Sequence, residues 1–259
     1  MKTVKLLKGI LAISVLICAG LLVYYFKSTS DKKEQQKKLE QEENVLLEYI
    51  TSTPQSDRVT YAVDFFYESI PYKVQQKMVV DFEDESVKVA LEDLKYVQIR
   101  YFDFEQKEHV GQIICNKYIA QDLVEIFYEL HKMKYPFDKI ALIDEYSGDD
   151  NASMADNNTC CFNYRTISGT EELSLHAYGY AIDINPLYNP YVIYNSDPLY
   201  VLPANAQAYT DREAEFEGKI TTEDPCYQLF IEHGYTWGGS WDTPTDYQHF
   251  EKVPAEMEQ

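Results

Sequence analysis

Basic residues are scarce in this chain. Its 259 residues include 23 Lys and Arg against 43 Asp and Glu, which gives a formal net charge of −20 at pH 7. Nucleic acids and anionic membrane surfaces attract proteins mainly through Lys and Arg, so this balance argues against both as the main partner. Acidity spread over a whole domain is usually only a solvated surface, and it identifies no substrate.

Cysteine is also rare, and its spacing matches no zinc motif. Of the five cysteines, Cys18 lies in an apolar run near the N-terminus. The other four could pair by number, but a bond between the adjacent Cys160 and Cys161 would be strained. We therefore expect ordinary, partly buried thiols at Cys115, Cys160, Cys161 and Cys226.

Residues 9–26 form an uncharged apolar run. As a helix this run would span about 27 Å, close to the roughly 30 Å of a hydrocarbon core. A cleaved signal peptide is the alternative, but its apolar stretch is normally shorter and ends at a small-residue site. We expect a single-pass membrane anchor at 9–26, preceded by a cytoplasmic tail at 1–8.

The rest of the chain divides by composition into a spacer and one domain. Residues 27–69 begin with a Lys-, Glu- and Gln-rich stretch and form a juxtamembrane spacer and lead-in. Residues 70–259 form the main domain. Lysines on both sides of the apolar run leave its orientation open, and the chemistry of the domain places it outside the membrane.

Strand and helix patterns mix in the main domain without a regular βαβ repeat. This indicates an α+β fold, with a small antiparallel sheet and flanking helices. The patterns predict a hairpin of 97–101 with 110–115, a helix capped by Asn116, a strand at 139–143, and a helix between Asp224 and Gly234. The long polar segment 144–173 is expected to be a loop that forms one wall of a cleft.

Two distant motifs suggest a metal site. Two imidazoles and one carboxylate are usual protein ligands of a catalytic zinc, with a fourth position left for water. His176 and Asp183 lie on either side of Gly179, which allows a sharp turn, and His249 lies near the C-terminus. A strand from Tyr180 would aim Asp183 and Asn185 at the cleft and Ile182 at the core. We predict that Zn²⁺ binds His176, Asp183 and His249.

Asp246 lies three residues before His249. From there it can reach the water without being a ligand, take its proton as it attacks a carbonyl, and pass the proton to the leaving amine. Asp246 is therefore the predicted general base. The alternative is a surface carboxylate in a turn.

Three further residues are candidates for substrate contact. Arg165 could hold a substrate carboxylate or stabilise a developing oxyanion, although a structural ion pair would explain it almost as well. Ser174 could hydrogen-bond the substrate or fix the loop. Trp237 could belong to an aromatic wall, and core packing is the alternative.

These residues resemble the zinc D-alanyl-D-alanine carboxypeptidase family, which includes L-alanyl-D-glutamate endopeptidases. The shared pattern is Ser-x-His-x-x-Gly-x-Ala-x-Asp at 174–183 and Asp-x-x-His at 246–249. The likeness spans roughly residues 70 to 254. It implies a small hedgehog-like α+β fold, zinc on His176, Asp183 and His249, Asp246 as base, Arg165 as a substrate or transition-state contact, and peptidoglycan stem peptides as substrates.

The expected function is a membrane-anchored zinc peptidase that acts outside the membrane on a stem-peptide amide bond. Removal of a terminal D-Ala and cleavage between L-Ala and D-Glu both remain open. One alternative is a zinc-containing cell-wall-binding or signalling domain without turnover. Another is a tethered structural protein without metal.

Overall fold

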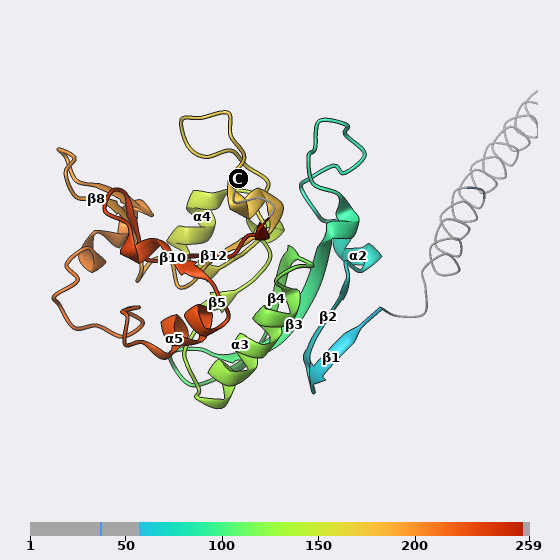
Figure 1. Cartoon of the computed structure of the whole chain (residues 1–259), viewed down its shortest axis with the longest axis horizontal. Coiled ribbons are helices and arrows are strands. Elements are labelled where there is room, and N and C mark those ends of the chain that lie inside the picture. The colour runs from blue at the N-terminus through green and yellow to red at the C-terminus, as the bar shows by residue number, and fades with distance from the viewer. Residues whose placement is uncertain (1–36, 38–56, 256–259) are drawn as a thin grey trace, which may run out of the picture. The chain divides into compact units, whose positions relative to one another are not determined.

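The computed structural model describes residue 37 and residues 57–255 (Figure 1). The expected cytoplasmic tail at 1–8 and membrane anchor at 9–26 lie outside the described residues, as does most of the spacer. Within the described part of the chain, no helix is long and apolar enough to cross a membrane. The compact unit begins at Asp57, so the lead-in expected to end at residue 69 is partly inside the fold.

The largest sheet is a four-stranded antiparallel sheet in the order β1-β2-β3-β4. The long pair at its edge confirms the predicted hairpin, with Val97 opposite Ile113. Apolar residues alternate along β3, so Val97 and Ile99 face one core while Leu94 and Tyr96 face another. The strands are β1 (Val59–Ala62), β2 (Phe65–Ser69), β3 (Leu94–Phe102) and β4 (Glu108–Asn116).

Helix α3 (Ala120–Lys132) covers one face of this sheet (Figure 1). The predicted helix is confirmed, and it packs through one apolar face, since Leu123, Ile126 and Leu130 are completely buried. The predicted cap is wrong. Asn116 lies four residues before the helix begins, and its side chain accepts a hydrogen bond from the Tyr118 backbone instead. Short polar side chains often close such local turns, which compete with helix.

The second half of the chain forms several small sheets. One has the order β10-β12-β7 and another β11-β8-β9, both antiparallel, while β5 and β6 form a parallel pair. The α+β class with antiparallel sheets is therefore confirmed. The strands are β5 (Lys139–Ile140), β6 (Asn158–Thr159), β7 (Ala181–Asp183), β8 (Tyr191–Ile193), β9 (Tyr200–Leu202), β10 (Thr236–Trp237), β11 (Thr245–Asp246) and β12 (His249–Glu251).

The segment 144–173 is more structured than the expected loop. It contains part of the 3-10 helix η2 (Ile143–Tyr146), the helix α4 (Asp150–Ala155) and strand β6. Asp149 caps α4 by accepting from the Ala152 backbone at 3.0 Å. Many of its polar residues therefore serve as caps and turns. The preceding strand is also shorter than predicted, since β5 ends at Ile140.

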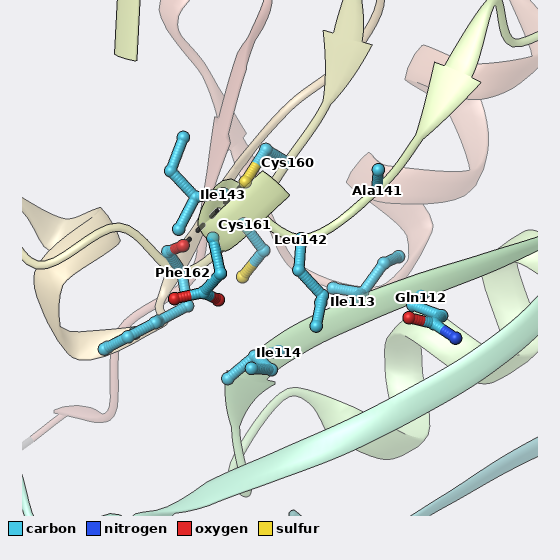
Figure 2. Close-up of a pocket in the computed structure, with 10 residues that line it drawn as sticks. Gln112, Ile113, Ile114, Ala141, Leu142, Ile143, Cys160, Cys161 and Phe162 are labelled. Carbon is cyan, nitrogen blue, oxygen red and sulfur yellow. Dashed lines mark hydrogen bonds between the residues drawn. The ribbon is translucent and has the colours of Figure 1, made fainter. Parts of the chain in front are cut away.

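A short extended segment connects the main sheet to the small sheets. Cys160 exchanges two backbone hydrogen bonds with Asp183 of β7, while the Phe162 amide donates to Ile114 of β4 at 3.0 Å. Figure 2 shows residues 160–162 beside Ile113 and Ile114. The four cysteines of the described residues are free thiols, as expected, with Cys160 partly exposed and the other three buried.

Helix α5 (Pro225–Glu232) agrees with its predicted signals. The Asp224 side chain accepts from the Cys226 amide at 2.8 Å, and Gly234 adopts a left-handed conformation with φ +82° after the helix ends. Phe230 of α5 stacks on Phe250 of β12 with ring centroids 4.5 Å apart. This contact anchors β12 in the core.

Candidate functional site

Two of the predicted metal ligands come from neighbouring strands. In the antiparallel pair of β7 and β12, Asp183 is directly opposite His249. Directly opposed residues project from the same face of a sheet. Asp183 Oδ1 is consequently 3.2 Å from His249 Nδ1. Ile182 packs in the core on the other side, as predicted.

His176 reaches the same point from the 3-10 helix η3 (Leu175–Tyr178), whose Ser174 cap accepts from the His176 amide at 3.3 Å. Gly179 ends η3 with φ +70°, and a Cβ there would lie 2.6 Å from the backbone nitrogen of Asn116. Only glycine fits this turn without displacement. His176 Nε2 then lies 3.3 Å from Asp183 Oδ1 and 3.1 Å from His249 Nδ1.

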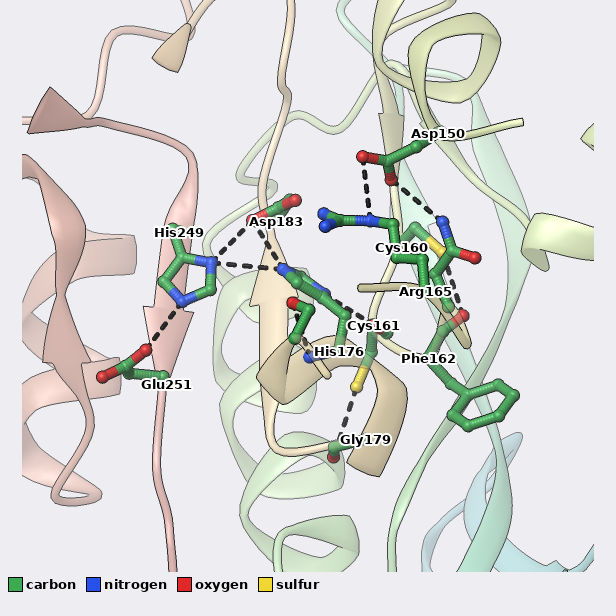
Figure 3. Close-up of polar contacts among 12 residues, drawn as sticks. Asp150, Cys160, Cys161, Phe162, Arg165, His176, Gly179, Asp183, His249 and Glu251 are labelled. Atoms are coloured by element: carbon green, nitrogen blue, oxygen red, sulfur yellow. Dashed lines mark hydrogen bonds and ion pairs between the residues drawn. The ribbon is translucent and has the colours of Figure 1, made fainter. Parts of the chain in front are cut away.

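The outer nitrogens of both imidazoles are held by acceptors (Figure 3). His176 Nδ1 is 2.7 Å from the Cys161 carbonyl oxygen, and His249 Nε2 is 2.9 Å from Glu251 Oε2. A carbonyl or carboxylate oxygen only accepts, so each outer nitrogen carries a proton. In the neutral imidazoles, the two inner nitrogens therefore present lone pairs to each other and to Asp183.

Three facing lone pairs leave a position for a cation, which can be a proton when no metal is bound. The distances of 3.1 to 3.3 Å match the edge of a zinc tetrahedron, about 3.3 Å for ligand bonds of about 2.0 Å. The three residues are buried, and they are the one His/Cys/Asp/Glu cluster of this kind among the described residues. His176, Asp183 and His249, termed here the His–Asp–His trio, thus fit a metal ion.

The electrostatics of the trio also favour a positive charge at its centre. Burial raises the pKa of Asp183, but the charge of His176 and hydrogen bonds from both histidines outweigh it and hold the pKa well below its ordinary value. Burial lowers the pKa of His249, but hydrogen bonds to Asp183 and Glu251 raise it to about 10. Both shifts show that the pocket stabilises positive charge.

Asp246 lies beside the trio at the end of β11, where it is opposite Tyr191 of β8. Its Oδ1 atom is buried and has no hydrogen-bond partner among the described residues. Burial raises the pKa of Asp246 to about 7, although the positive charge of His249 opposes the rise. A buried carboxylate with one free oxygen and a pKa near neutrality is suited to proton transfer.

Gly238 allows the backbone to pack closely against Asp246 and His249. It lies in the 3-10 helix η5 (Gly238–Ser240), and a Cβ there would lie 2.7 Å from the Asp246 carbonyl oxygen and 3.3 Å from the His249 Cβ. The backbone of η5 therefore packs directly behind the base and the third ligand.

Arg165 projects into the same cleft from the segment after β6. Its Nε atom lies 3.0 Å from Asp150 Oδ2, and the other oxygen of Asp150 accepts from Asn163 at 3.0 Å. Figure 3 shows the guanidinium extending from Asp150 toward His176 and Asp183. Because Asp150 faces the Nε atom, the two terminal nitrogens remain as an end-on fork for an anion.

The other two predicted substrate contacts differ in their surroundings. Ser174 lines the cleft, and its hydroxyl caps η3, so it has the loop-fixing role. Trp237 is buried, donates from its indole nitrogen to the Tyr247 carbonyl at 2.9 Å, and stacks on Phe250. The structure thus places Trp237 in the core, and Trp241 lines the cleft instead, with its ring 5.4 Å from that of His249.

Asn185, expected to face the cleft, is completely buried. It adopts φ +43°, and its side chain accepts from the Asp138 amide and donates to the Pro136 carbonyl, both at 3.1 Å. The extended strand ends at Asp183, so the alternation of faces does not continue to Asn185.

The cleft has a volume of about 580 Å³ and combines charged and apolar walls. The sequence motifs did not indicate a role for Asp150, Glu251 or the apolar wall. Glu251 could have been found, since it lies two residues after His249 on the same strand face. The apolar lining consists of Met154, Ile167, Leu175, Tyr191, Ile193, Tyr200, Leu202, Trp241 and Pro244.

Comparison with protein families confirms the resemblance. Residues 168–252 match the family described as D-alanyl-D-alanine carboxypeptidase. The matched segment includes the His–Asp–His trio and Asp246, and Arg165 precedes it. This segment is a domain of a zinc metallopeptidase family. Comparisons with curated proteins and with solved structures gave no match.

Proposed function

We propose that this chain is a zinc carboxypeptidase that removes the terminal D-alanine from peptides ending in D-Ala-D-Ala, such as peptidoglycan stem peptides. The observation that carries this proposal is the convergence of three lone pairs beside an unpartnered, buried carboxylate oxygen of Asp246. The family match supports the same reaction and substrate end group.

His176, Asp183 and His249 would hold the zinc. When bound, zinc supplies Lewis-acid polarisation of the substrate carbonyl and acidifies water at the site. Asp246 removes the proton from the attacking water and returns it to the leaving amine. Burial raises the pKa of Asp246, to about 7 before a cation binds, and so favours a group that both takes and returns a proton.

Arg165 suits a substrate with a free carboxylate next to the cleaved bond. Such a carboxylate can accept two parallel hydrogen bonds from the terminal nitrogens of its guanidinium, while Asp150 lies at Nε. The α-carboxylate of D-Glu, which is linked through its γ-carboxyl, offers the same contact beside an L-Ala–D-Glu bond. The choice of a carboxypeptidase therefore rests on the family match.

A zinc-containing binding or signalling domain without turnover is the second candidate. It requires no base, and a carboxylate oxygen that is buried without a hydrogen bond would then serve nothing. Asp246 Oδ1 is in that unfavourable state beside the trio, which favours the enzyme.

The proposed location is the outer face of a cell membrane, with residues 9–26 as a single anchor. The apolar run supports the anchor, and the outer location rests on the proposed substrate, since peptidoglycan peptides are found on that side. The proposal predicts that the chain partitions with membranes and that protease added to intact cells degrades the domain.

The test is mass spectrometry of products after the full chain, solubilised in detergent and loaded with zinc, is incubated with a pentapeptide-stem muropeptide. Loss of one alanine supports the proposal. Release of the peptide from D-Glu onward would show an L-Ala–D-Glu endopeptidase instead. Absence of any cleavage by metal-loaded protein would overturn the peptidase and favour the binding domain.

A further inference from the structure

The sheet that carries Asp246 also carries the apolar wall of the cleft. In the order β11-β8-β9, Asp246 is opposite Tyr191, and Tyr191 is opposite Leu202. Directly opposed residues of antiparallel strands share one face. The general base and these two side chains therefore form one row, and all three line the cleft.

A second row lies two residues further along the same strands. Ile193 is opposite Tyr200, and the period of two places this pair on the same face as Tyr191 and Leu202. Both members of the pair line the cleft, and Tyr200 is 44% exposed. We term Tyr191, Ile193, Tyr200 and Leu202 the apolar platform.

The other face of this sheet is used for packing. Val192 and Val201, which are opposite each other, are buried against Ala206. The sheet is thus held by its inner face, while its outer face presents large apolar side chains to an open cleft. Packing of the fold does not account for that outer face.

In the proposed reaction, the residue that precedes D-Ala-D-Ala is the part of the substrate that still lacks a binding site. The terminal carboxylate belongs at Arg165, and the last two residues of D-Ala-D-Ala have only methyl side chains. Successive residues of an extended peptide advance by about 3.3 Å, and the two rows of the platform are separated by about twice that rise. The residue that precedes D-Ala-D-Ala can therefore reach the platform while the cleaved bond lies near Asp246.

We propose that the apolar platform is the subsite for the residue that immediately precedes D-Ala-D-Ala, and that it packs against the apolar part of that residue's side chain. This inference rests on the proposed carboxypeptidase function. The occupant is the substrate itself because the platform continues, in one row, from the general base inside the cleft. Contact between apolar surfaces removes both from water and stabilises the bound peptide.

The test uses the zinc-loaded full chain and N-acetylated peptides of the form X-D-Ala-D-Ala, in which X is Gly, Ala, Leu or Phe. We expect kcat/KM for Leu or Phe to exceed that for Gly by at least about 10-fold, the size of effect that apolar pockets give. Tyr200→Ala and Ile193→Ala should each lower this ratio. Tyr61→Ala should leave it unchanged, since Tyr61 is equally exposed, at 44%, but lies on β1.

The outcomes separate the two proposals. If no peptide is hydrolysed, the carboxypeptidase function fails. If all four peptides are hydrolysed with the same kcat/KM, the function stands and the platform is not a specificity subsite. The native chain alone gives this answer, so the test does not depend on the variants folding. Equal lowering of the ratio by Tyr61→Ala would also contradict the platform.

Discussion

Asp183 and His249 are directly opposite each other across β7 and β12, with Asp183 Oδ1 3.2 Å from His249 Nδ1. The backbone register of one strand pair thus sets the spacing of two metal ligands. A shift of one strand by one residue would turn its ligand to the other face of the sheet. The third ligand, His176, is positioned separately by the turn at Gly179.

Glu251 is predicted to set the zinc affinity through His249. It accepts from His249 Nε2 at 2.9 Å and so directs Nδ1 to the centre of the trio. Loss of such a partner typically weakens metal binding about 10- to 100-fold. We expect that loss for Glu251→Leu and a smaller one for Glu251→Gln, which can still accept the hydrogen bond.

Zinc dissociation constants, measured by competition with a chelating dye, check this prediction. Glu232→Leu is the control, since Glu232 is exposed at the end of α5. Equal affinities for the native chain and Glu251→Leu would show that Glu251 does not position His249.

The pH dependence of kcat/KM should report Asp246. The base must be deprotonated, so activity falls as the pH drops through its pKa of about 7. One unit below that pKa, only about a tenth of the molecules have the base ionised. A bound cation lowers the pKa of a nearby carboxylate, so the limb should lie at or below this value. If kcat/KM of the zinc-loaded chain rises further as the pH falls below 5, Asp246 is not the base.

Arg165 should raise kcat/KM for peptides that have a free terminal carboxylate. Hydrogen bonds to charged groups contribute about 1.5–3 kcal/mol, so Arg165→Ala should lower kcat/KM by about 10- to 150-fold. The same peptides with a C-terminal amide should be poor substrates of the native chain and lose little more in the variant. Arg100→Ala, in a surface ion pair with Asp64 and Glu108, is the control. An equal loss on both kinds of peptide would indicate a structural role for Arg165.

Gly179 should be intolerant of any side chain. Gly179→Ala combines a left-handed φ with a Cβ 2.6 Å from the Asn116 nitrogen, so the free energy of unfolding should fall by about 2–4 kcal/mol. Gly169→Ala is the matched control, because Gly169 has φ +81° but nothing within 4 Å of the new Cβ. Gly169→Ala should lower the free energy of unfolding by only about 1 kcal/mol. Urea unfolding measures both, and equal losses would mean that the contact with Asn116 does not matter.

The sequence predicted those parts of the site that depend on residue type and local spacing. His176, Gly179 and Asp183 lie within eight residues, so their relation depends on one local turn. Asp246 and His249 are similarly close, although the approach of the two groups depends on strand pairing. That pairing is a tertiary contact, which local spacing does not specify. In the sequence, the two motifs were linked only because both contain residue types that bind zinc.

The parts that the sequence did not predict depend on distant contacts. Asp150 meets Arg165 only because α4 folds within a segment expected to be a loop. Trp237 and Trp241 lie four residues apart on either side of η5, where neither helical nor strand periodicity decides which ring is buried. The apolar platform depends on the register of two short strands, which no local pattern specifies.

The most direct test of the central claim compares zinc content and turnover in two variants. His176→Ala and Asp246→Asn are purified beside the native chain, zinc is counted by elemental mass spectrometry, and release of D-alanine from a D-Ala-D-Ala peptide is measured. We expect about one zinc per native chain, little in His176→Ala, and full zinc with turnover lowered at least about 100-fold in Asp246→Asn. Full zinc in His176→Ala, or undiminished turnover in Asp246→Asn, would contradict the proposed division between a metal-binding trio and a separate base.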